Sequence, residues 1–529
     1  MRILLVEPDY RKNSASAKEV AETTETTPRK KRDDELLWYP PLGLMKLATF
    51  HKVRGDEVKF VSGCDKSVFK FKDLPLFSSI NLWDRVYITT LFTYQWKKTI
   101  GTINFYKDAV GGSLHKIFVG GIMASLMPNE IYEETNVFPV VGVLNSPKQI
   151  SLDGDENIDL LPPDYDILDN KLYAIAETYY AYTTRGCINK CEYCGVRDIE
   201  PAYINYIDIK NAVRQLREKY GDKAKLKLMD NNVLASPQLF QIVEDLVELG
   251  YGKNQFTETR PRRLRTIDFN QGLDASKINE KTMSLLSKLN IRPMRIAFDN
   301  VKEKKIYERA VDIARSHGVT DFSNYMLYNW KDTPKDLYER LKINIKINEK
   351  LGRGKGKASA AIYSYPMRYA PIRSKDSSES SINRDYIAPA PKGKHNYLKY
   401  PLWTKRFTRN IEIMKGAASG VISPTPTLAR RTIGKSFTEF IANLYMPGEL
   451  LRYRDKYERR VYKHEPKRRP GTGDVEKFRK FILVLLKGQN KTFLEFHNAV
   501  SSNTKAAIKE YRKKCMNRRI LKWLDFYLK

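Results

Sequence analysis

Three cysteines that fall within eight residues constrain this sequence more than any other feature. Cys187, Cys191 and Cys194 have the spacing C-x3-C-x2-C. Three thiolates this close together indicate a loop that folds around one metal centre. Cuboidal iron–sulfur clusters are otherwise held by four cysteines, so a cluster held by three has one iron open to a ligand from outside the protein. The spacing therefore predicts an iron–sulfur cluster at which chemistry can take place.

Two other interpretations of these cysteines fit the sequence less well. A tetrahedral zinc site needs a fourth Cys or His ligand. No histidine lies between His115 and His317, and the two other cysteines, Cys64 and Cys515, are remote in the sequence. A thiol-rich surface loop with redox-active cysteines is the second alternative.

With an aromatic residue, Tyr193, just before the third cysteine, the motif resembles that of the radical S-adenosylmethionine (radical SAM) enzymes. The resemblance implies a [4Fe–4S] cluster on Cys187, Cys191 and Cys194, with the amino and carboxylate groups of SAM bound to the free iron. It further implies that the reduced cluster cleaves SAM to methionine and a 5'-deoxyadenosyl radical. Tyr193 would contact the adenine.

Residues 1–165 alternate short apolar segments with helix-like ones. The predicted strands are residues 3–6, 57–61, 85–91, 116–120 and 137–143, and the predicted helices are residues 42–54, 97–110 and 125–134. This alternation predicts an α/β domain with a doubly wound parallel sheet, which would bind ligands at the carboxyl ends of its strands. With the linker at residues 159–165, the region resembles the Rossmann-like, cobalamin-binding-type domain of one radical SAM subgroup.

Cobalamin itself is implied less directly than the fold of this domain. The Asp-x-His-x-x-Gly motif that supplies an axial histidine in cobalamin-dependent mutases is absent, and His51 and His115 stand in other contexts. Some relatives in the subgroup bind the cofactor without that histidine, whereas others keep the fold without the cofactor. Whether this chain binds cobalamin therefore stays open. The polar stretch 9–34 is expected to be disordered, or else a lid over the ligand crevice.

Residues 175–372 return to the alternation of strand and helix. Strands are predicted at residues 181–184, 225–229, 266–269, 294–298, 324–328 and 360–364, with helices at 208–220, 237–249, 280–289, 303–317 and 334–351. Six strands with crossover helices predict a partial (β/α)6 TIM-type barrel, which is also the fold that the radical SAM resemblance implies. The active site would then lie at the carboxyl ends of these strands.

Polar residues follow several of these predicted strands. Burial of polar groups is costly, so polar residues at the ends of buried strands indicate a functional or structural role. By the resemblance, Asp230 and Asn231 would hold the methionine amino group of SAM. Gln271, Asp274 and Arg295 could hydrogen-bond its ribose or carboxylate. Helix capping and an ordinary salt bridge explain these last three residues equally well.

Residues 391–529 are strongly basic, with 33 Lys and Arg against 11 Asp and Glu, so they hold 22 of the 31 net positive charges of the chain. Aromatic residues are interleaved with the bases, as in the run 452–460. Clustered cations attract a phosphate backbone and aromatic rings stack on unpaired bases, so nucleic acid, RNA in particular, is one predicted partner. A solvated basic surface is the alternative. Apolar spacing at residues 478–486 and 508–528 predicts a mainly α-helical, folded region.

The sequence is typical of a cytoplasmic enzyme. Its five cysteines show no disulfide framework, no apolar run is long enough for a membrane helix, and residues 1–7 are expected to form a buried strand rather than a signal peptide. A radical SAM enzyme would also need an electron donor such as flavodoxin or ferredoxin.

Two classes of function remain open at this stage. The first is a radical SAM enzyme that modifies a nucleic acid, or a cobalamin-dependent radical SAM methyltransferase that acts on a small molecule. The second is a non-catalytic iron–sulfur protein that binds nucleic acid. A structural cluster is normally closed by four ligands, so the three-cysteine motif favours the enzyme.

Overall fold

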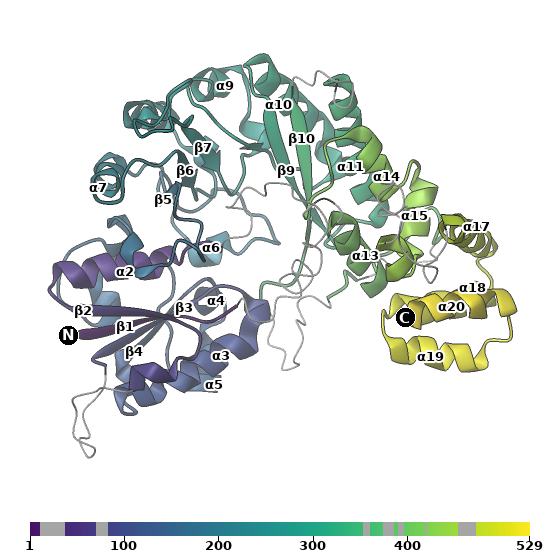
Figure 1. Cartoon of the computed structure of the whole chain (residues 1–529), viewed down its shortest axis with the longest axis horizontal. Coiled ribbons are helices and arrows are strands. Elements are labelled where there is room, and N and C mark those ends of the chain that lie inside the picture. Colours follow the sequence, from purple (N-terminus) through teal and green to yellow (C-terminus); the bar gives the residue numbers. More distant parts are fainter. Residues whose placement is uncertain are drawn as a thin grey trace. The chain divides into compact units, whose positions relative to one another are not determined.

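A computed structural model describes residues 1–10, 38–69, 83–352, 360–373, 386–389, 396–416, 418, 420–452 and 472–528. The chain divides into two compact units, whose elements are labelled in Figure 1. Unit 1 comprises Met1–Gln271, Lys288–Ile291 and Pro371–Arg384, and unit 2 comprises Gly272–Ser287, Arg292–Ala370 and Asp385–Lys529. Among the residues just given, no helix is both long and apolar enough to span a membrane.

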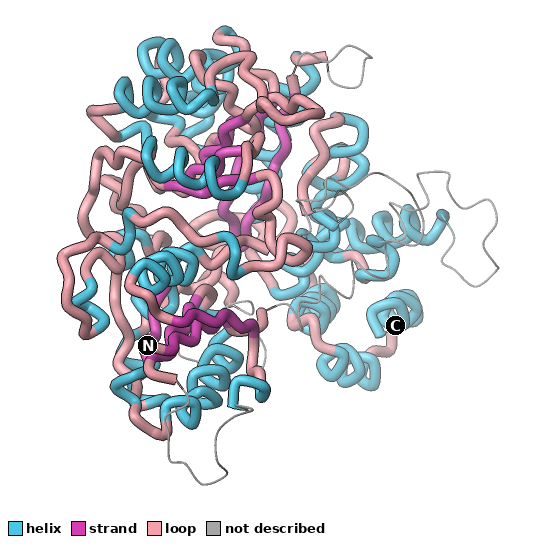
Figure 2. Tube along the Cα trace, turned by 60° about the vertical axis from the view of Figure 1, so that its left-hand side comes forward, coloured by secondary structure: helices cyan, strands magenta, loops and turns pink. Residues whose placement is uncertain are grey.

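The amino-terminal part of unit 1 is a parallel sheet with the strand order β2-β1-β3-β4. Its strands are β1 (Arg2–Glu7), β2 (Glu57–Ser62), β3 (Arg85–Thr90) and β4 (Ile117–Gly121). Figures 1 and 2 show helices on both faces of the sheet. They are α2 (Leu42–Val53), α3 (Trp96–Phe105), α4 (Ile122–Leu126) and α5 (Pro128–Thr135). The first four predicted strands and the first two predicted helices of this region are confirmed.

Alternation along β1 explains why both faces of this sheet are covered. Leu4 and Val6 join the apolar core that includes Ile103 of α3, whereas Ile3 and Leu5 join the core that includes Leu44 of α2. Because successive side chains of a strand point to opposite faces, a run of apolar residues requires helices on both sides.

Two predictions for this region are wrong in detail. Residues 137–143 form no strand, and this segment contacts β4 through a bond from the N–H of Val140 to the carbonyl of Val119 (2.8 Å). Pro139 lacks the N–H that a strand at this position would use for pairing. The predicted helix 125–134 is two helices, α4 and α5, because Pro128 disfavours helical geometry at Met127, which has φ −137° and ψ 50°.

The second sheet of unit 1 has the order β5-β6-β7 and is also parallel. It consists of β5 (Thr178–Ala181), β6 (Lys225–Leu228) and β7 (Thr266–Phe269), with helices α6 (Val196–Ile199), α7 (Lys210–Tyr220) and α8 (Leu239–Leu246). The prediction of a strand at residues 181–184 is displaced: β5 ends at Ala181. Thr183 and Thr184 bond to a carboxylate instead of a neighbouring strand.

Unit 2 begins with a third parallel sheet, in the order β10-β9-β8. It contains β8 (Met294–Arg295), β9 (Asp321–Tyr328) and β10 (Ala361–Arg368), with helices α9 (Glu280–Leu286), α10 (Lys304–Ser316) and α11 (Pro334–Lys350). The six strands predicted for a barrel are therefore present, three in each unit, although β8 is shorter than expected. Their closure into one barrel stays a prediction.

The rest of unit 2 is helical, as the basic carboxyl-terminal region was predicted to be. The helices are α13 (Lys405–Gly416), α14 (Pro426–Ile433), α15 (Phe437–Tyr445), α17 (Thr472–Gly488), α18 (Lys491–Ser501), α19 (Lys505–Lys514) and α20 (Arg518–Leu528). Residues 508–528, where apolar spacing predicts helices, form α19 and α20; the side chain of Asn517 accepts from the N–H groups of Arg519 and Ile520 and so begins α20. The predictions for residues 11–34 and 453–460 lie outside the described residues.

Candidate metal centre

The three cysteines lie on one loop of unit 1, between β5 and α6. Cys187, Cys191 and Cys194 are half-buried and form no disulfide. The N–H of Cys194 donates to the carbonyl of Cys191 at 3.1 Å, which closes a turn around Tyr193. The structure thus holds the whole motif in one local fold.

The three sulfur atoms are near enough to influence one another electrostatically. Burial raises the pKa of the Cys194 thiol, a hydrogen bond from the backbone of Val196 opposes this, and Cys191 and Cys187 raise the pKa further. Across the described ranges, no three His, Cys, Asp or Glu side chains converge as ligands of a single metal ion would.

Cys187 receives two hydrogen bonds at its sulfur. The backbone N–H of Asn189 donates to it at 3.4 Å, and the side-chain Nδ2 of Asn232 donates at 3.5 Å. Asn232 belongs to the segment that follows β6, so the neighbouring strand contributes directly to the loop. Hydrogen bonds to cysteine sulfur are among the interactions that set the reduction potential of a bound cluster.

The loop begins at a position that only glycine can occupy. Gly186 has φ +74°, and a Cβ atom there would lie 2.4 Å from the carbonyl oxygen of Ala202. The N–H of Gly186 donates to Glu200 Oε2 at 2.6 Å. The backbone just before Cys187 is therefore fixed by close packing and by a charge-assisted hydrogen bond.

Asp230, one of the predicted SAM ligands, is placed next to the start of the loop. Its Oδ1 accepts from Thr183 N (2.9 Å) and from the hydroxyls of Thr183 and Thr184 (both 2.8 Å), and also from Thr184 N. Burial raises the pKa of this carboxyl, and the bonds from the two threonines oppose the shift. Asp230 thus orients the backbone that leads from β5 into the cysteine loop.

Two buried oxygen atoms on the segment that follows β6 have no hydrogen-bond partner within the part of the chain that the structure describes. They are Oδ2 of Asp230 and Oδ1 of Asn232, on side chains of residues that are 2% and 3% exposed. Asn231, the other predicted ligand of the SAM amino group, donates its Nδ2 to Glu200 Oε2 at 2.8 Å. Buried acceptors without a donor are uncommon in proteins, and a ligand that donates hydrogen bonds would satisfy them.

The other residues predicted to contact SAM, Gln271, Asp274 and Arg295, lie outside the cysteine loop. Gln271 is exposed at the end of unit 1. In unit 2, Asp274 caps a turn by accepting from Ser276 N at 2.9 Å, and the N–H of Leu273 donates to the carbonyl of Arg295 at 2.7 Å. The capping explanation is thus observed for Asp274. Contacts of these residues with SAM stay predictions, as does the contact of Tyr193 with adenine.

Sequence reasoning missed Glu200 and Asn232. A signal for Asn232 was available, because it is the third of three consecutive polar residues after a buried strand, of which only Asp230 and Asn231 were assigned. Glu200 carried no such signal, since nothing in its sequence context marks a contact with Gly186.

No family model matches this sequence, and no curated protein matches it significantly. Among solved structures, the chain is similar to the radical SAM methyltransferase TsrM from Kitasatospora setae, solved with cobalamin and a [4Fe–4S] cluster (14% identity, 69% of this chain and 74% of the other, TM-score 0.46). It is also similar to Streptococcus suis SuiB bound to SAM (16% identity, 38% of this chain and 40% of the other, TM-score 0.24). A third similar structure is HydG, a maturase of the [FeFe]-hydrogenase (14% identity, 70% of this chain and 88% of the other, TM-score 0.30).

Proposed function

We propose that this chain is a radical SAM enzyme that holds a [4Fe–4S] cluster through Cys187, Cys191 and Cys194 and binds SAM at the remaining iron. The observation that carries the proposal is a set of three mutually close thiols on one loop, none of them in a disulfide, together with two buried oxygen atoms that lack a donor on the segment after β6. When bound and reduced, such a cluster supplies electrons that cleave SAM to methionine and a 5'-deoxyadenosyl radical, which abstracts hydrogen from a substrate.

The chain's own residues would hold and orient the ligand. The ammonium group of a SAM methionine is a donor with a positive charge, so it suits Asp230 Oδ2 and Asn232 Oδ1, which are acceptors. Asn232 bonds to Cys187 and Asp230 bonds to Thr184 at the start of the loop, which supports binding of the amino group next to the open iron. Glu200, through Gly186 N, would keep the loop closed around the cluster.

Anaerobic reconstitution with iron and sulfide tests this proposal directly. The protein should acquire about four irons per chain, and dithionite plus SAM should then yield 5'-deoxyadenosine. A variant with Cys187, Cys191 and Cys194 all changed to Ala is the control and should acquire none. A wild-type cluster that forms but never cleaves SAM would favour the alternative function, a non-catalytic iron–sulfur protein.

Cobalamin is a second proposed cofactor, at the carboxyl ends of β1 to β4, and it would allow methyl transfer. Both ring nitrogens of His51 are engaged, Nδ1 with Asp56 Oδ2 (2.6 Å) and Nε2 with the Tyr87 hydroxyl (3.0 Å), and the residue is fully buried. His115 precedes β4, at the opposite ends of the strands. A corrinoid would thus be bound without either histidine. Its absorption spectrum after incubation and desalting tests this, and loss of all corrinoid on desalting would remove cobalamin from the proposal.

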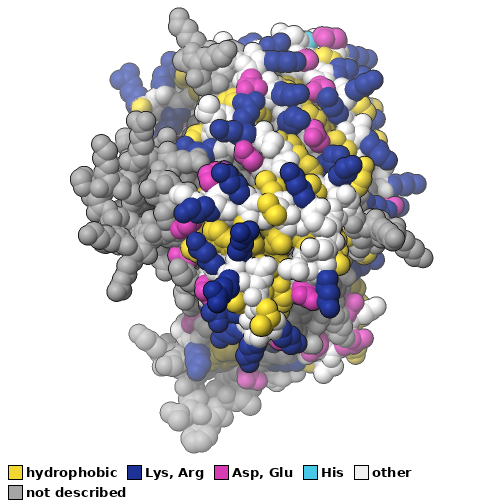
Figure 3. All heavy atoms as spheres, turned by 90° about the vertical axis from the view of Figure 1, so that its right-hand side faces the viewer, with side chains coloured by type: hydrophobic (Ala, Val, Ile, Leu, Met, Phe, Trp, Pro, Cys, Tyr) yellow, Lys and Arg dark blue, Asp and Glu magenta, His cyan; other side chains and the backbone are white. Residues whose placement is uncertain are grey.

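RNA is the proposed macromolecular substrate, docked on helices α19 and α20. Residues 505–528 hold eight Lys and Arg, all exposed, against two Asp and Glu. Figure 3 views the side that carries these helices and shows Lys and Arg in excess over acidic side chains. The cations are Lys505, Lys509, Arg512, Lys513, Lys514, Arg518, Arg519 and Lys522. Such a density of positive charge suits a phosphate backbone.

The remaining parts of the proposal follow from the cluster. Reduction in the cell requires a one-electron donor such as flavodoxin or ferredoxin. An oxygen-sensitive cluster and cysteines that form no disulfide suit the reducing cytoplasm.

A further inference from the structure

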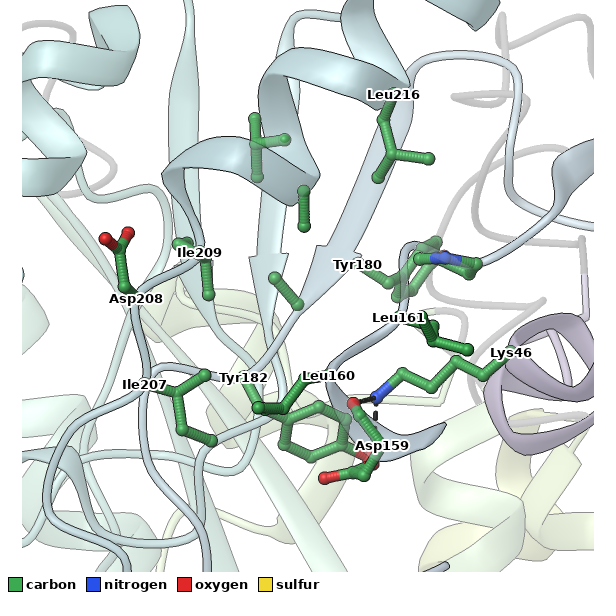
Figure 4. Close-up of a pocket in the computed structure, with 14 residues that line it drawn as sticks. Lys46, Asp159, Leu160, Leu161, Tyr180, Tyr182, Ile207, Asp208, Ile209 and Leu216 are labelled. Atoms are coloured by element: carbon green, nitrogen blue, oxygen red, sulfur yellow. Dashed lines mark hydrogen bonds and ion pairs between the residues drawn. The ribbon is translucent and has the colours of Figure 1, made fainter. Parts of the chain in front are cut away.

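A lysine of the amino-terminal sheet domain is buried against the linker that leads to the cysteine loop. Lys46 of α2 donates its Nζ to Asp159 Oδ1 at 2.8 Å and also to the carbonyl of Asp159. Figure 4 shows the lysine pointing at this carboxylate beside Tyr182. The two charged side chains are only 12% and 11% exposed. Removal of one partner from such a buried ion pair is costly, because it leaves the other charge buried without compensation.

The same carboxylate also holds the arginine that opens the loop. Arg185 donates its Nε to Asp159 Oδ2 at 2.9 Å and its Nη2 to Asp159 Oδ1, so the pair is bidentate. The guanidinium lies 3.4 Å from the centre of the Tyr182 ring. Arg185 therefore has a single defined orientation, two residues before Cys187.

From Arg185 the contacts continue to the backbone of the cysteine loop. Its Nη1 donates to Glu200 Oε1 at 2.7 Å, and Glu200 Oε2 accepts from Gly186 N at 2.6 Å and from Asn231 Nδ2 at 2.8 Å. An unbroken series of hydrogen bonds thus connects helix α2 to the residue before Cys187. The four charged side chains in it, Lys46, Asp159, Arg185 and Glu200, have no net charge.

Docking of the linker on α2 does not by itself require Lys46. Thr49 donates its hydroxyl to the carbonyl of Pro162 at 2.6 Å, Lys52 pairs with Asp164 at 2.6 Å, and the N–H of Asp164 donates to the carbonyl of Met45 at 3.0 Å. Of the α2 side chains named here, Lys46 contacts the series that ends at Gly186, and it adds a positive charge to that series. Its contribution is therefore electrostatic as well as structural.

We propose that Lys46 and Asp159 are positioning residues for the iron–sulfur cluster, so that the amino-terminal sheet domain is a part of the cluster site. This inference rests on the proposed function. Removal of Lys46 leaves the buried set with one net negative charge, and removal of the Asp159 charge leaves it with one net positive charge. A reduced cluster carries one more negative charge than the oxidised form, so the two changes should shift its reduction potential in opposite directions.

The test is an anaerobic redox titration of the full-length, reconstituted protein without SAM, followed by electron paramagnetic resonance. Lys46→Met should lower the midpoint potential of the cluster, and Asp159→Asn should raise it. Lys46→Arg should restore the wild-type value, since the cavity of about 40 Å³ beside Lys46 gives the larger side chain room. Opposite shifts cannot come from a common loss of structure.

Lys52→Met is the matched control, because it breaks an ion pair between the same helix and the same linker without contact to Arg185. It should leave the potential unchanged. Equal potentials in wild type, Lys46→Met and Asp159→Asn, or shifts in the same direction, would overturn the inference. If Lys46→Met does not fold, the comparison of Asp159→Asn with wild type and Lys52→Met still decides it. A wild-type protein that acquires no cluster would instead refute the proposed function.

Discussion

The carboxylate of Glu200 accepts a hydrogen bond of 2.6 Å from the backbone N–H of Gly186, the residue that precedes the first cysteine of the loop. This bond ties the cysteine loop to the end of α6 and the segment that follows it. The position has a positive φ and no room for a side chain, so the bond and the glycine act together.

Gly186→Ala should disrupt the cysteine loop. Its Cβ would meet the carbonyl of Ala202 at 2.4 Å, and the positive φ adds strain of about 1–3 kcal/mol. We expect a lower thermal midpoint and loss of most of the iron after reconstitution. Gly112→Ala has a similar φ (+76°) but no atom within 4 Å, so it should bear the same φ strain without the clash and leave the iron content intact. Equal iron contents in the two variants would contradict this prediction.

Asn232→Leu should lower the midpoint potential of the cluster. The Nδ2–H of Asn232 stabilises negative charge on Cys187 Sγ, so its loss disfavours the reduced form. A hydrogen bond of roughly 0.5–1.5 kcal/mol corresponds to about 20–60 mV for a one-electron couple. Redox titration without SAM measures the shift. Asn231→Leu, which bonds to Glu200 instead of sulfur, should change the potential less; a larger effect from Asn231 would contradict the assignment.

The helical region of unit 2 should lose stability in mild acid because of His497. Burial lowers the pKa of this histidine to about 4, and its Nδ1 is paired with the hydroxyl of Tyr445 at 2.7 Å. The unfolded chain takes up a proton near pH 6.5 whereas the folded chain does not, so stability is complete above that pH. It should fall by about 3 kcal/mol between pH 6.5 and 4.

Urea unfolding at several pH values measures this loss. His497→Gln cannot titrate and should flatten the dependence in that range. His115→Gln, which changes an exposed histidine, should keep the slope of the wild type. An unchanged slope in His497→Gln would show that other groups cause the acid sensitivity.

Charge reversal on the α19–α20 surface should weaken RNA binding in a salt-dependent way. With Lys509, Lys513, Arg518 and Arg519 changed to Glu, up to four phosphate contacts are lost, and the slope of log K against log salt should fall by roughly 3. Filter binding at several salt concentrations measures it. The control reverses four exposed cations near α10 in the same unit, which are Lys302, Lys304, Lys305 and Arg309. If both variants lose affinity for RNA equally, the α19–α20 surface is not a specific RNA-binding site.

The sequence by itself determined the cysteine loop and most of the elements around it. The thiols of Cys187, Cys191 and Cys194 are close because they are neighbours in the chain, and apolar periodicity located most of the strands because burial on a sheet is a local pattern. The sequence pattern misplaced an element where contacts with other segments decide whether a strand forms. Residues 137–143 have apolar strand character, but they contact β4 through the N–H of Val140 without forming a strand.

Only the tertiary structure decided which distant residues complete the site. Lys46 lies 141 positions before Cys187 and Asn232 lies 45 after it, and although polar residues after a buried strand single out the segment of Asn232, nothing in the sequence shows that either residue contacts the loop. They reach the loop because helix α2 packs on the linker and because β6 pairs with β5 in parallel, which brings the ends of both strands to one edge. Such contacts depend on the packing of elements, which is non-local, and a pattern along one segment does not encode it.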